Sequence, residues 1–282
     1  MSAPTYLVIG HITLDVVSGG YTIGGTATYS AVTAARLGWE PRVLTSCSLQ
    51  GKQYLAKVLP ADQFQCLPAG ATTTFENVYV GGTRRQHIRA VAEMLRPADV
   101  PRQWLNSDIV HIGPVAEETD PELLQVFAGR CTLGVTPQGW LRTWDSEGAI
   151  RRRRWEPDAP SLSSIDAIVL SEEDVNGNAD LIEYYAAHCP LTVVTKGYRG
   201  CTLHMRGDVL TLNARAAREV DPTGAGDVFS AAFFVRLHET GDPILAARFA
   251  NVAGSFSVEQ VGIAGIPSRP IVEAWLAAHP DS

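Results

Sequence analysis

Short apolar runs alternate with helical segments along most of the chain, and this rhythm limits the fold more than any other feature. Residues 6–10 read as a buried strand that ends in glycine. Residues 26–37 then read as a helix closed by Gly38, and residues 42–46 as a second strand. Strand, helix and strand within about 40 residues make a βαβ unit, which implies a parallel sheet with right-handed crossovers. The sequence therefore predicts an α/β fold.

The same alternation returns in the second half of the chain and places most of the remaining elements. Strands are predicted at 108–113, 131–135, 166–170 and 191–195, a hairpin at 201–212 around residues 206–208, and helices at 121–127, at 179–188 and through the C-terminal third. Two segments, about 12–23 and about 72–90, break the rhythm and read as strands that leave the main sheet. We expect one domain over residues 1–282, with a doubly wound, mostly parallel sheet flanked by helices and a small β lid over one edge.

Composition narrows the class of protein. Hydrophobic residues make up 45% of the chain and charged residues 19%, which is typical of a globular protein with a buried core. The formal net charge of −7 disfavours nucleic-acid and anionic-membrane partners, since both require a basic surface. The sequence shows neither a membrane-spanning apolar run nor a secretory leader, so the cytoplasm is the expected compartment.

The cysteine content also favours a reducing compartment. The chain has five: Cys47, Cys66, Cys131, Cys189 and Cys201. None forms a C-x-x-C pair, and their odd number fits a reducing compartment better than a disulfide framework. Most lie in apolar segments, where a cysteine is expected to pack as a small hydrophobic residue.

Residues 221–227 read DPTGAGD and lead directly into the apolar run VFSAAFFVRL. Glycine surrenders much backbone freedom on folding, so small residues here indicate that a ligand comes close to the backbone. Uncovered N–H groups at a helix start, together with the helix dipole, favour an anion. Asp227 can then accept a proton from a substrate hydroxyl while the amides of Gly224, Ala225 and Gly226 hold a phosphate. The alternative is a glycine-rich helix start in which Asp227 only caps the helix.

The DPTGAGD string resembles the signature of the PfkB/ribokinase family of carbohydrate kinases, and the resemblance covers nearly the whole chain. Gly24-Gly25 ahead of a helix is similar to the family's di-glycine motif on the sugar side. Residues 194–200 (VTKGYRG) are similar to its strand and turn on the nucleotide side. The resemblance implies a ribokinase-like fold and an ATP-dependent kinase that uses Mg²⁺. It also implies that Asp227 is the catalytic base and that the amides of residues 224–226 form the anion hole for the γ-phosphoryl group.

The resemblance further implies binding residues on both sides of the site. Asp15 would bind substrate hydroxyls beside Gly24 and Gly25, because a carboxylate accepts two hydrogen bonds from a diol; a turn or cap aspartate is the alternative. The residues implied on the nucleotide side are Thr195, Gly197, Gly200 and Asn251. For Asn251, bracing of a neighbouring loop remains an alternative to contact with the nucleotide.

One element departs from the family pattern. The N-x-x-E motif near the metal and the phosphates is replaced here by Ser171-Glu-Glu-Asp174. Asp174 is expected to hold magnesium-bound waters, since Mg²⁺ requires hard oxygen ligands, although its side chain is shorter than glutamate. Alternatively, Glu172 and Glu173 are simple surface acids.

Three stretches in the middle of the chain resemble the myo-inositol-kinase-like branch of the family. They are residues 74–77 (TFEN), 111–114 (HIGP) and 137–142 (PQGWLR). The resemblance makes Asn77, Gln138 and Arg142 candidate substrate-pocket residues. A structural ion-pair partner is the alternative for Arg142, because pocket shape rather than short motifs decides the substrate.

The run Arg151-Arg-Arg-Arg154 has the look of a nucleic-acid patch, but its context favours a hairpin. It follows a turn at residues 145–148 and lies between Trp144 and Trp155. One basic run in an acidic protein is a weak footprint for nucleic acid. We therefore predict a hairpin strand with alternating arginines.

The sequence as a whole predicts an ATP- and Mg²⁺-dependent phosphotransferase that acts on a hydroxyl of a small sugar or a myo-inositol-like cyclitol. A nucleoside kinase is the enzymatic alternative and would require aromatic residues such as Phe75 or Trp140 to stack on a base. A catalytically silent metabolite sensor is the alternative from another class, and the altered Ser171–Asp174 element is its support. The sequence leaves open the hydroxyl that is phosphorylated, a monovalent-cation requirement and a homodimer formed through lid strands.

Overall fold

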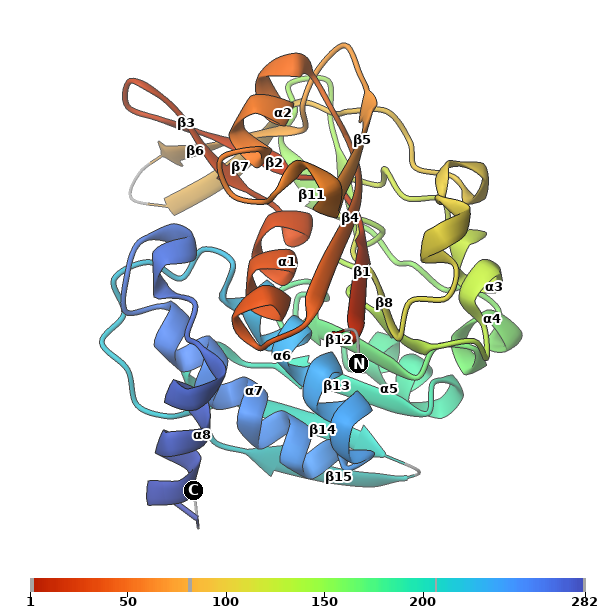
Figure 1. Ribbon diagram of the computed structural model, residues 1–282, viewed down its shortest axis with the longest axis vertical. Coiled ribbons are helices and arrows are strands. Elements are labelled where there is room, and N and C mark those ends of the chain that lie inside the picture. The colour runs from red at the N-terminus through yellow and green to blue at the C-terminus, as the bar shows by residue number, and fades with distance from the viewer. Residues whose placement is uncertain (1–2, 81–82, 206, 281–282) are drawn as a thin grey trace.

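A computed structural model describes residues 3–80, 83–205 and 207–280. Within these residues the main sheet has nine strands in the order β15-β14-β13-β12-β9-β8-β1-β4-β5 (Figure 1). Their bounds are β1 Thr5–Ile9, β4 Glu40–Cys47, β5 Phe64–Pro68, β8 Ile109–Ile112, β9 Thr132–Val135, β12 Ala167–Ser171, β13 Leu191–Thr195, β14 Cys201–Met205 and β15 Asp208–Leu212. The strands from β13 to β5 are parallel, and β14 and β15 add an antiparallel edge.

Helices cover both faces of this sheet, as the sequence predicts. Their bounds are α1 Thr26–Arg36, α2 Leu49–Leu55, α3 Leu123–Phe127, α4 Ala159–Ser163, α5 Ala179–His188, α6 Ala225–Thr240, α7 Pro243–Ser257 and α8 Arg269–Ala278. Alternate strand residues face opposite layers. In β1, Tyr6 and Val8 pack in the cluster with α1, α6 and α7, whereas Leu7 and Ile9 pack in the cluster with α3, α4 and α5. The expected doubly wound α/β fold is confirmed.

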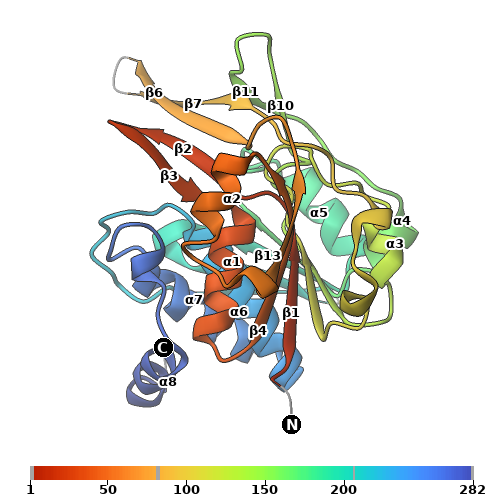
Figure 2. The ribbon, with the colours of Figure 1, turned by 45° about the horizontal axis from the view of Figure 1, so that its top comes forward.

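A second, four-stranded sheet projects from one end of the molecule (Figure 2). It has the order β3-β2-β6-β7 and consists of β2 Thr13–Val17, β3 Gly20–Gly24, β6 Thr74–Val80 and β7 Thr83–Ala90. We call this sheet the lid sheet. Its strands come from the two segments that break the α/β rhythm; residues 81–82 lie outside the described chain. A small hydrophobic cluster of Phe75, Ile88, Val115 and Ala116 packs beneath it.

Two hairpins agree with the sequence analysis. β10 (Arg142–Trp144) and β11 (Ile150–Arg152) form an antiparallel pair, so the first two residues of the arginine run lie in a hairpin strand and the other two follow it. β14 and β15 also pair antiparallel, although Arg206 in their turn lies outside the described residues. Three of the helices and strands given above, α2, α4 and the edge strand β5, have no counterpart in the sequence analysis.

The cysteine prediction is wrong for one pair. Cys47 at the end of β4 and Cys66 in β5 form a disulfide, whereas Cys131, Cys189 and Cys201 are free. The two strands are neighbours in the sheet, and their register brings the Cα atoms of this pair to 6.3 Å. The two cysteines are 19 residues apart in the sequence, and the pairing of β4 with β5 brings them close enough to bond. The number of cysteines alone carries no information about this contact.

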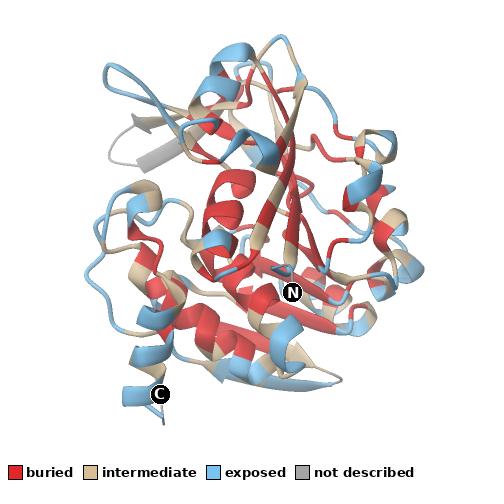
Figure 3. Ribbon diagram, viewed as in Figure 1, coloured by how far each residue is buried: buried red, intermediate tan, exposed pale blue. Residues whose placement is uncertain are grey.

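Burial follows the layers. Figure 3 shows buried residues concentrated along the main sheet and in α1, with exposed residues on the outer helices and the projecting strands. Among the described residues, none of the helices combines the length and the apolar character needed to cross a bilayer. The core is therefore a single layered sheet with helices on both sides, and it holds the loops at the strand ends rigidly in place.

Candidate active site

The candidate site lies where the parallel strands of the main sheet end. His11 follows β1, Gly113 follows β8, Gln138 lies just beyond β9 and Asp174 just beyond β12. Parallel strands present their carboxyl ends at one edge, and in open α/β sheets this edge is where ligands bind. The first turns of α1 and α6 meet the same edge, because Thr26 of α1 contacts Asp227 of α6.

Asp227 is held in the first turn of α6, partly buried. The hydroxyl of Thr26 donates a hydrogen bond to Asp227 Oδ1 at 2.6 Å. Burial raises the pKa of Asp227 to about 6, the Thr26 hydrogen bond and the charge of Arg142 oppose this rise, and the charge of Asp174 adds to it. A carboxyl group with this pKa is ionised near neutral pH yet able to take up a proton, which suits a general base.

The glycines of the signature have different surroundings. Gly224 precedes α6 with a left-handed backbone (φ 76°), and a Cβ atom there would collide with the ring of Tyr29. Gly226 is exposed, and a Cβ atom there would meet open space. The Ala225 N–H donates to Pro222 O at 3.2 Å, so this amide of the expected anion hole already has a partner. Gly224 therefore serves packing, and the open face of the helix start is at Gly226.

Gly226→Ala tests whether a ligand approaches this face. We expect the variant to keep or raise the free energy of unfolding, by up to about 1 kcal/mol, because alanine favours a helix over glycine. Phosphoryl transfer should fall at least tenfold by rough estimate, because a methyl group would occupy the approach to the amides. Urea melts and donor turnover on the same preparation check both effects. Equal activity in the variant and the wild type would show that no ligand comes close to Gly226.

Arg142, Gln138 and Asp174 form a polar cluster next to Asp227. Gln138 Nε2 donates to Asp174 Oδ1 at 3.3 Å, and Asp174 Oδ2 accepts from the Ser171 N–H at 3.0 Å. The Asp174 N–H in turn donates to Ser171 Oγ at 3.1 Å. Serine and aspartate at these two positions thus satisfy each other's backbone groups in the manner of a capping box. The Ser171–Asp174 departure from the family pattern is a locally stable arrangement.

Arg142 is the buried cation of this cluster. It is 8% exposed and donates from one terminal nitrogen to Val115 O at 3.2 Å, while its guanidinium lies 5.8 Å from the centre of the Phe75 ring. Among the described residues its Nε has no hydrogen-bond partner. Burial lowers the pKa of Arg142 to about 10, against the opposing charges of Asp174, Asp227 and Glu118. Arg142 therefore stays charged at neutral pH and faces carboxylates on more than one side.

Asp15 and the di-glycine motif lie together at the base of the lid sheet. Asp15 is in β2 and partly buried, and a Cβ atom at Gly24 would collide with its carboxylate. Gly25 has a φ of 86° and caps α1, and a Cβ atom there would meet the backbone of His11 and Thr13. The two glycines therefore let α1 start directly against the strand that carries Asp15.

Asn77 lies in the lid sheet rather than in the sheet edge. It is in β6, two residues after Phe75, so both side chains point to the same face of the strand. Phe75 contacts Arg142 and its Cα pairs with that of Asp15. Asn77 therefore continues the face of the lid sheet that looks toward the polar cluster.

The nucleotide-side residues cluster around the segment that follows β15. Gly200 has a φ of 88°, and a Cβ atom there would collide with Leu212 O. Asn251 in α7 is buried and donates to Leu212 O and Asn213 O at 3.4 and 3.3 Å, so its amide braces this segment. Thr195 donates to Leu170 O at 3.4 Å, and Gly197 begins the turn that follows β13. Contact of these residues with a nucleotide stays a prediction.

Several residues at the site were missed by the sequence analysis. Thr26 donates a hydrogen bond to Asp227, the candidate base. Tyr29 lies close to the site as well: burial raises the pKa of its hydroxyl, and the charges of Asp221, Asp227 and Asp15 raise it further. Both lie one turn apart in the helix after the di-glycine motif, so their spacing was the available signal. Glu118 is 2% exposed and accepts hydrogen bonds from the backbone N–H groups of His11, Val115 and Ala116. It had no signal in the sequence.

The aromatic residues do not offer a free face to a base. Trp140 is 1% exposed, stacks on Trp155 with ring centroids 4.4 Å apart, and donates its indole N–H to Thr119 O. Phe75 is 4% exposed and lies against Arg142. The interpretation of Trp140 as a stacking residue is therefore wrong, because its ring is part of the core.

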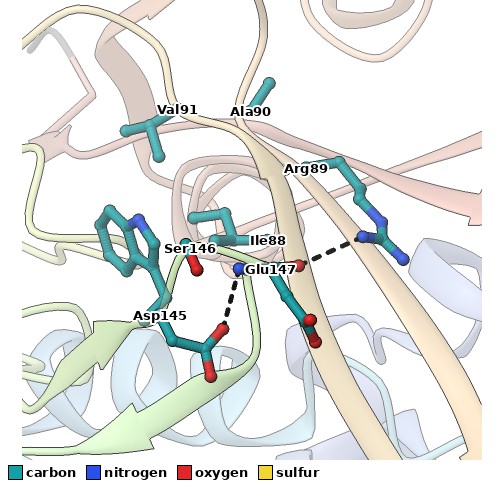
Figure 4. Close-up of a pocket in the computed structure, with 9 residues that line it drawn as sticks. Ile88, Arg89, Ala90, Val91, Asp145, Ser146 and Glu147 are labelled. Atoms are coloured by element: carbon teal, nitrogen blue, oxygen red, sulfur yellow. Dashed lines mark hydrogen bonds between the residues drawn. The ribbon is translucent and has the colours of Figure 1, made fainter.

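Two surface hollows border this region. One of about 380 Å³ is lined by Arg152, Arg153, Arg154 and Asp174 with neighbouring residues, so it opens beside the polar cluster. The other, of about 530 Å³, lies between the end of β7 and the turn of the β10–β11 hairpin (Figure 4). The second hollow lies outside the polar cluster, and none of the candidate site residues lines it.

Comparisons with known proteins agree with this geometry. Residues 159–269, which contain the DPTGAGD signature, match the family model of the pfkB family carbohydrate kinases. The chain is 27% identical over 248 residues to the cytidine kinase of Thermococcus kodakarensis, a match over 80% of this chain and 86% of that protein. It is 29% identical over 278 residues to the inositol 3-kinase of Oryza sativa subsp. japonica, over 91% of this chain and 69% of that protein.

A solved structure shows the same architecture. It is a pyrophosphate-dependent kinase in the ribokinase family, complexed with a pyrophosphate analog and myo-inositol. The two structures superpose with a TM-score of 0.78 at 23% identity, over 95% of this chain and 99% of that chain. At this identity the likeness establishes the fold and no more. The chain therefore has the ribokinase fold, and its residues 159–269 match the pfkB carbohydrate kinase family.

Proposed function

We propose that the protein transfers the terminal phosphoryl group of ATP to a hydroxyl of a small cyclitol or sugar, with a myo-inositol-like polyol as the acceptor class. The observation that carries the proposal is the partly buried Asp227 carboxylate with a raised pKa, held by Thr26 at the start of α6. A helix start with an uncovered glycine next to a base provides both the anion site and the proton acceptor that such a transfer requires.

The chemical step follows from the placement of these groups. The acceptor hydroxyl oxygen attacks the terminal phosphorus of the donor, and its proton passes to Asp227 Oδ2, because Oδ1 already accepts from Thr26. The bond from phosphorus to the bridging oxygen breaks, and ADP leaves. The open amides at the start of α6 and the guanidinium of Arg142 stabilise the charge that spreads over the phosphoryl oxygens.

Acceptor recognition falls to the edge between the lid sheet and the main sheet. Asp15 would accept hydrogen bonds from two hydroxyls, and Asn77, Gln138 and Arg142 would complete the polar surroundings of the ring. Closing the lid sheet over the acceptor would exclude water, whose attack on the donor would waste ATP. These roles are supported by the charge effect of Arg142 on Asp227, by the bond of Gln138 to Asp174, and by the pairing of Asp15 with Phe75 beside Arg142.

The chain fits magnesium held through water rather than directly. Among the described residues, no group of three His, Cys, Asp or Glu side chains is placed to hold a metal ion. Asp174 has one hydrogen bond on each carboxylate oxygen, which leaves lone pairs for metal-bound waters. Mg²⁺ carried on the donor phosphates would neutralise their charge, while Asp174 would orient its water shell.

A nucleoside kinase remains a second candidate because of one observation, the match to a cytidine kinase over 86% of that protein. The structure weakens it, since the rings of Trp140 and Phe75 are both buried against other side chains. A polar cluster of carboxylates, amide and guanidinium is better suited to a ring of hydroxyls than to a planar base.

Transfer should depend on pH through Asp227. The pKa of this group is raised from 3.8 to about 6, and only the ionised form accepts a proton. We expect log kcat/KM to fall with a slope of about one per pH unit below pH 6 and to level off above it. A pH series at saturating donor, with a stability check at each pH, measures this limb. A profile without an inflection between pH 5 and 7 would contradict the assignment of the base.

An acceptor panel tests the proposed function. The protein is incubated with Mg²⁺ and either ATP or pyrophosphate, together with cyclitols, sugars or nucleosides, and release of ADP or phosphate is followed. We expect acceptor-stimulated release with ATP and cyclitols. Stimulation by nucleosides alone would support the second candidate, and the absence of stimulation across the panel would favour a sensor without turnover.

A further inference from the structure

A buried histidine ties the lid sheet to the main sheet. His11 follows Gly10 at the end of β1, where the chain leaves the main sheet for β2, and it is fully buried. Its Nδ1 lies 2.6 Å from Thr73 Oγ1, and its Nε2 lies 2.9 Å from Glu93 O. Thr73 immediately precedes β6, and Glu93 lies three residues after β7. One imidazole ring therefore contacts both ends of the β6–β7 hairpin.

The hydrogen bonds of His11 with Thr73 and Glu93 assign the tautomer of the histidine ring. A carbonyl oxygen only accepts, so His11 Nε2 carries the proton that it donates to Glu93 O. The Thr73 hydroxyl accepts from the Ala92 N–H at 3.0 Å, and it donates its own proton to Nδ1. Burial lowers the pKa of His11 against the opposing charge of Glu118, which keeps the ring neutral. Both ring nitrogens of His11 and the Thr73 hydroxyl are then satisfied.

The same end of β7 has a second set of contacts. Ile88 N–H donates to Gly148 O at 2.8 Å, and Arg89 reaches Glu147 O at 3.4 Å, as Figure 4 shows for the second bond. These bonds attach the strand to the turn of the β10–β11 hairpin, and they end on backbone carbonyl groups. Just beyond the last backbone pair of β6 and β7, Thr74 with Ala90, the Thr73 hydroxyl adds a side-chain link, because it bonds both His11 and the Ala92 N–H.

Backbone pairing connects the cluster of His11, Thr73 and Glu93 to the acceptor pocket proposed above. Leu14 N–H donates to Thr73 O at 2.9 Å, and the next residue pairs are Leu14 with Thr74 and Asp15 with Phe75. Phe75 in turn lies over Arg142. Because strand pairing transmits the position of one residue to the next, a shift of Thr73 moves Phe75 relative to Asp15 and Arg142.

We propose that His11 is a positioning residue: its neutral ring clamps the two ends of the β6–β7 hairpin through Thr73 and Glu93 and so sets the place of the lid sheet over the acceptor. The clamp itself rests on the contacts above, and its consequence for catalysis rests on the proposed function. Loss of the clamp loosens the base of the lid sheet and weakens acceptor binding while Asp227 and the start of α6 keep their geometry.

The experiment removes the Thr73 hydroxyl without changing the shape of the side chain. Thr73→Val deprives both His11 Nδ1 and the Ala92 N–H of their partner, and Thr73→Ser keeps the hydroxyl. The matched control is Thr202→Val, since Thr202 is also buried and its hydroxyl bonds that of Thr211 at 3.1 Å, at the far edge of the main sheet. Each variant is compared by hydrogen exchange of individual peptides, by thermal melting, and by the KM and kcat for the acceptor.

We expect Thr73→Val to speed exchange of the β2 and β6 amides by roughly tenfold or more, with exchange in the main sheet unchanged. The acceptor KM should rise by a similar factor, kcat should change by less than about threefold, and acceptor-independent ATP hydrolysis should increase. Thr73→Ser should restore both readouts, and Thr202→Val should leave them at the wild-type level.

The outcomes separate the two claims. If Thr73→Val changes exchange no more in β2 and β6 than in the main sheet, or if Thr202→Val gives the same pattern, the clamp is refuted. If the wild type transfers no phosphate to any acceptor, the proposed function fails, and the exchange measurement still decides whether the clamp exists. If the lid amides exchange faster while the acceptor KM stays unchanged, the positioning role is refuted.

Discussion

Asp227→Asn is expected to lower kcat/KM for phosphoryl transfer by about 10²- to 10⁴-fold, because the variant cannot accept the proton of the acceptor hydroxyl. The same change should raise the free energy of unfolding at pH 8, since burial of the carboxylate raises its pKa to about 6. One pKa unit corresponds to about 1.4 kcal/mol, and solvent at the open side of the group reduces the gain, so we expect on the order of 1–2 kcal/mol. Urea melts and initial rates measure the two effects.

The direction of the pH effect follows from the sign of the shift. A raised carboxyl pKa means that the folded state binds the proton more tightly than the unfolded state. The cost of the charge is therefore fully present above pH 6 and disappears as the pH falls toward 3.8, so the variant and the wild type should converge in stability there. Asp166→Asn is a matched control for the loss of a buried carboxylate outside the candidate site. Burial also raises the pKa of Asp166, which lies just before β12 and accepts a hydrogen bond from the Leu133 N–H. Full activity in Asp227→Asn would remove the base from the mechanism.

Arg142→Met is expected to have the second large effect, on both stability and chemistry. It removes a buried cation that interacts electrostatically with Asp174 and Asp227, and it leaves Val115 O without this donor, which costs about 1–3 kcal/mol. Since the charge of Arg142 lowers the pKa of Asp227, the acid limb of the kcat/KM profile should move above pH 6 in the variant. Transfer should fall by about 10²-fold or more if the guanidinium also stabilises the phosphoryl group.

Two further variants make this prediction specific. Arg142→Lys keeps the charge, so it should hold the acid limb near its wild-type position while losing part of the rate. Arg215→Met removes a part-buried arginine that lies 3.9 Å from the centre of the Phe256 ring and pairs with Glu259, and its charge is not among those that shift the pKa of Asp227. It should lower stability and leave the pH profile unchanged. An unshifted acid limb in Arg142→Met would mean that Arg142 does not interact with Asp227.

The sequence predicts the parts of the fold that local patterns encode. The alternation of apolar runs and helices identifies the parallel sheet, and the DPTGAGD string identifies the start of α6 with Asp227 in its first turn. Asp221, at the start of the same string, holds the turn before α6, because its carboxylate accepts from the Thr223 and Gly262 N–H groups. In each case the information lies within a few neighbouring residues.

What the sequence does not reveal depends on contacts between distant segments. Cys47 and Cys66 form a disulfide because β5 joins the sheet beside β4. Trp140 is buried because its ring stacks on Trp155 and its indole N–H bonds Thr119 O. His11 and Glu118 are single residues outside any motif, and their roles arise only when loops from several strands meet. Tertiary packing decides these features, and short motifs carry no record of it.

Direct detection of the product tests whether the protein transfers a phosphoryl group to a polyol hydroxyl with Asp227 as the base. Phosphorus NMR of the protein with Mg-ATP and myo-inositol would follow the donor and the product in one sample. We expect a phosphomonoester signal that grows in step with ADP for the wild type and is lost in Asp227→Asn. ADP without a phosphorylated polyol, or an Asp227→Asn variant that forms the ester at the wild-type rate, would contradict it.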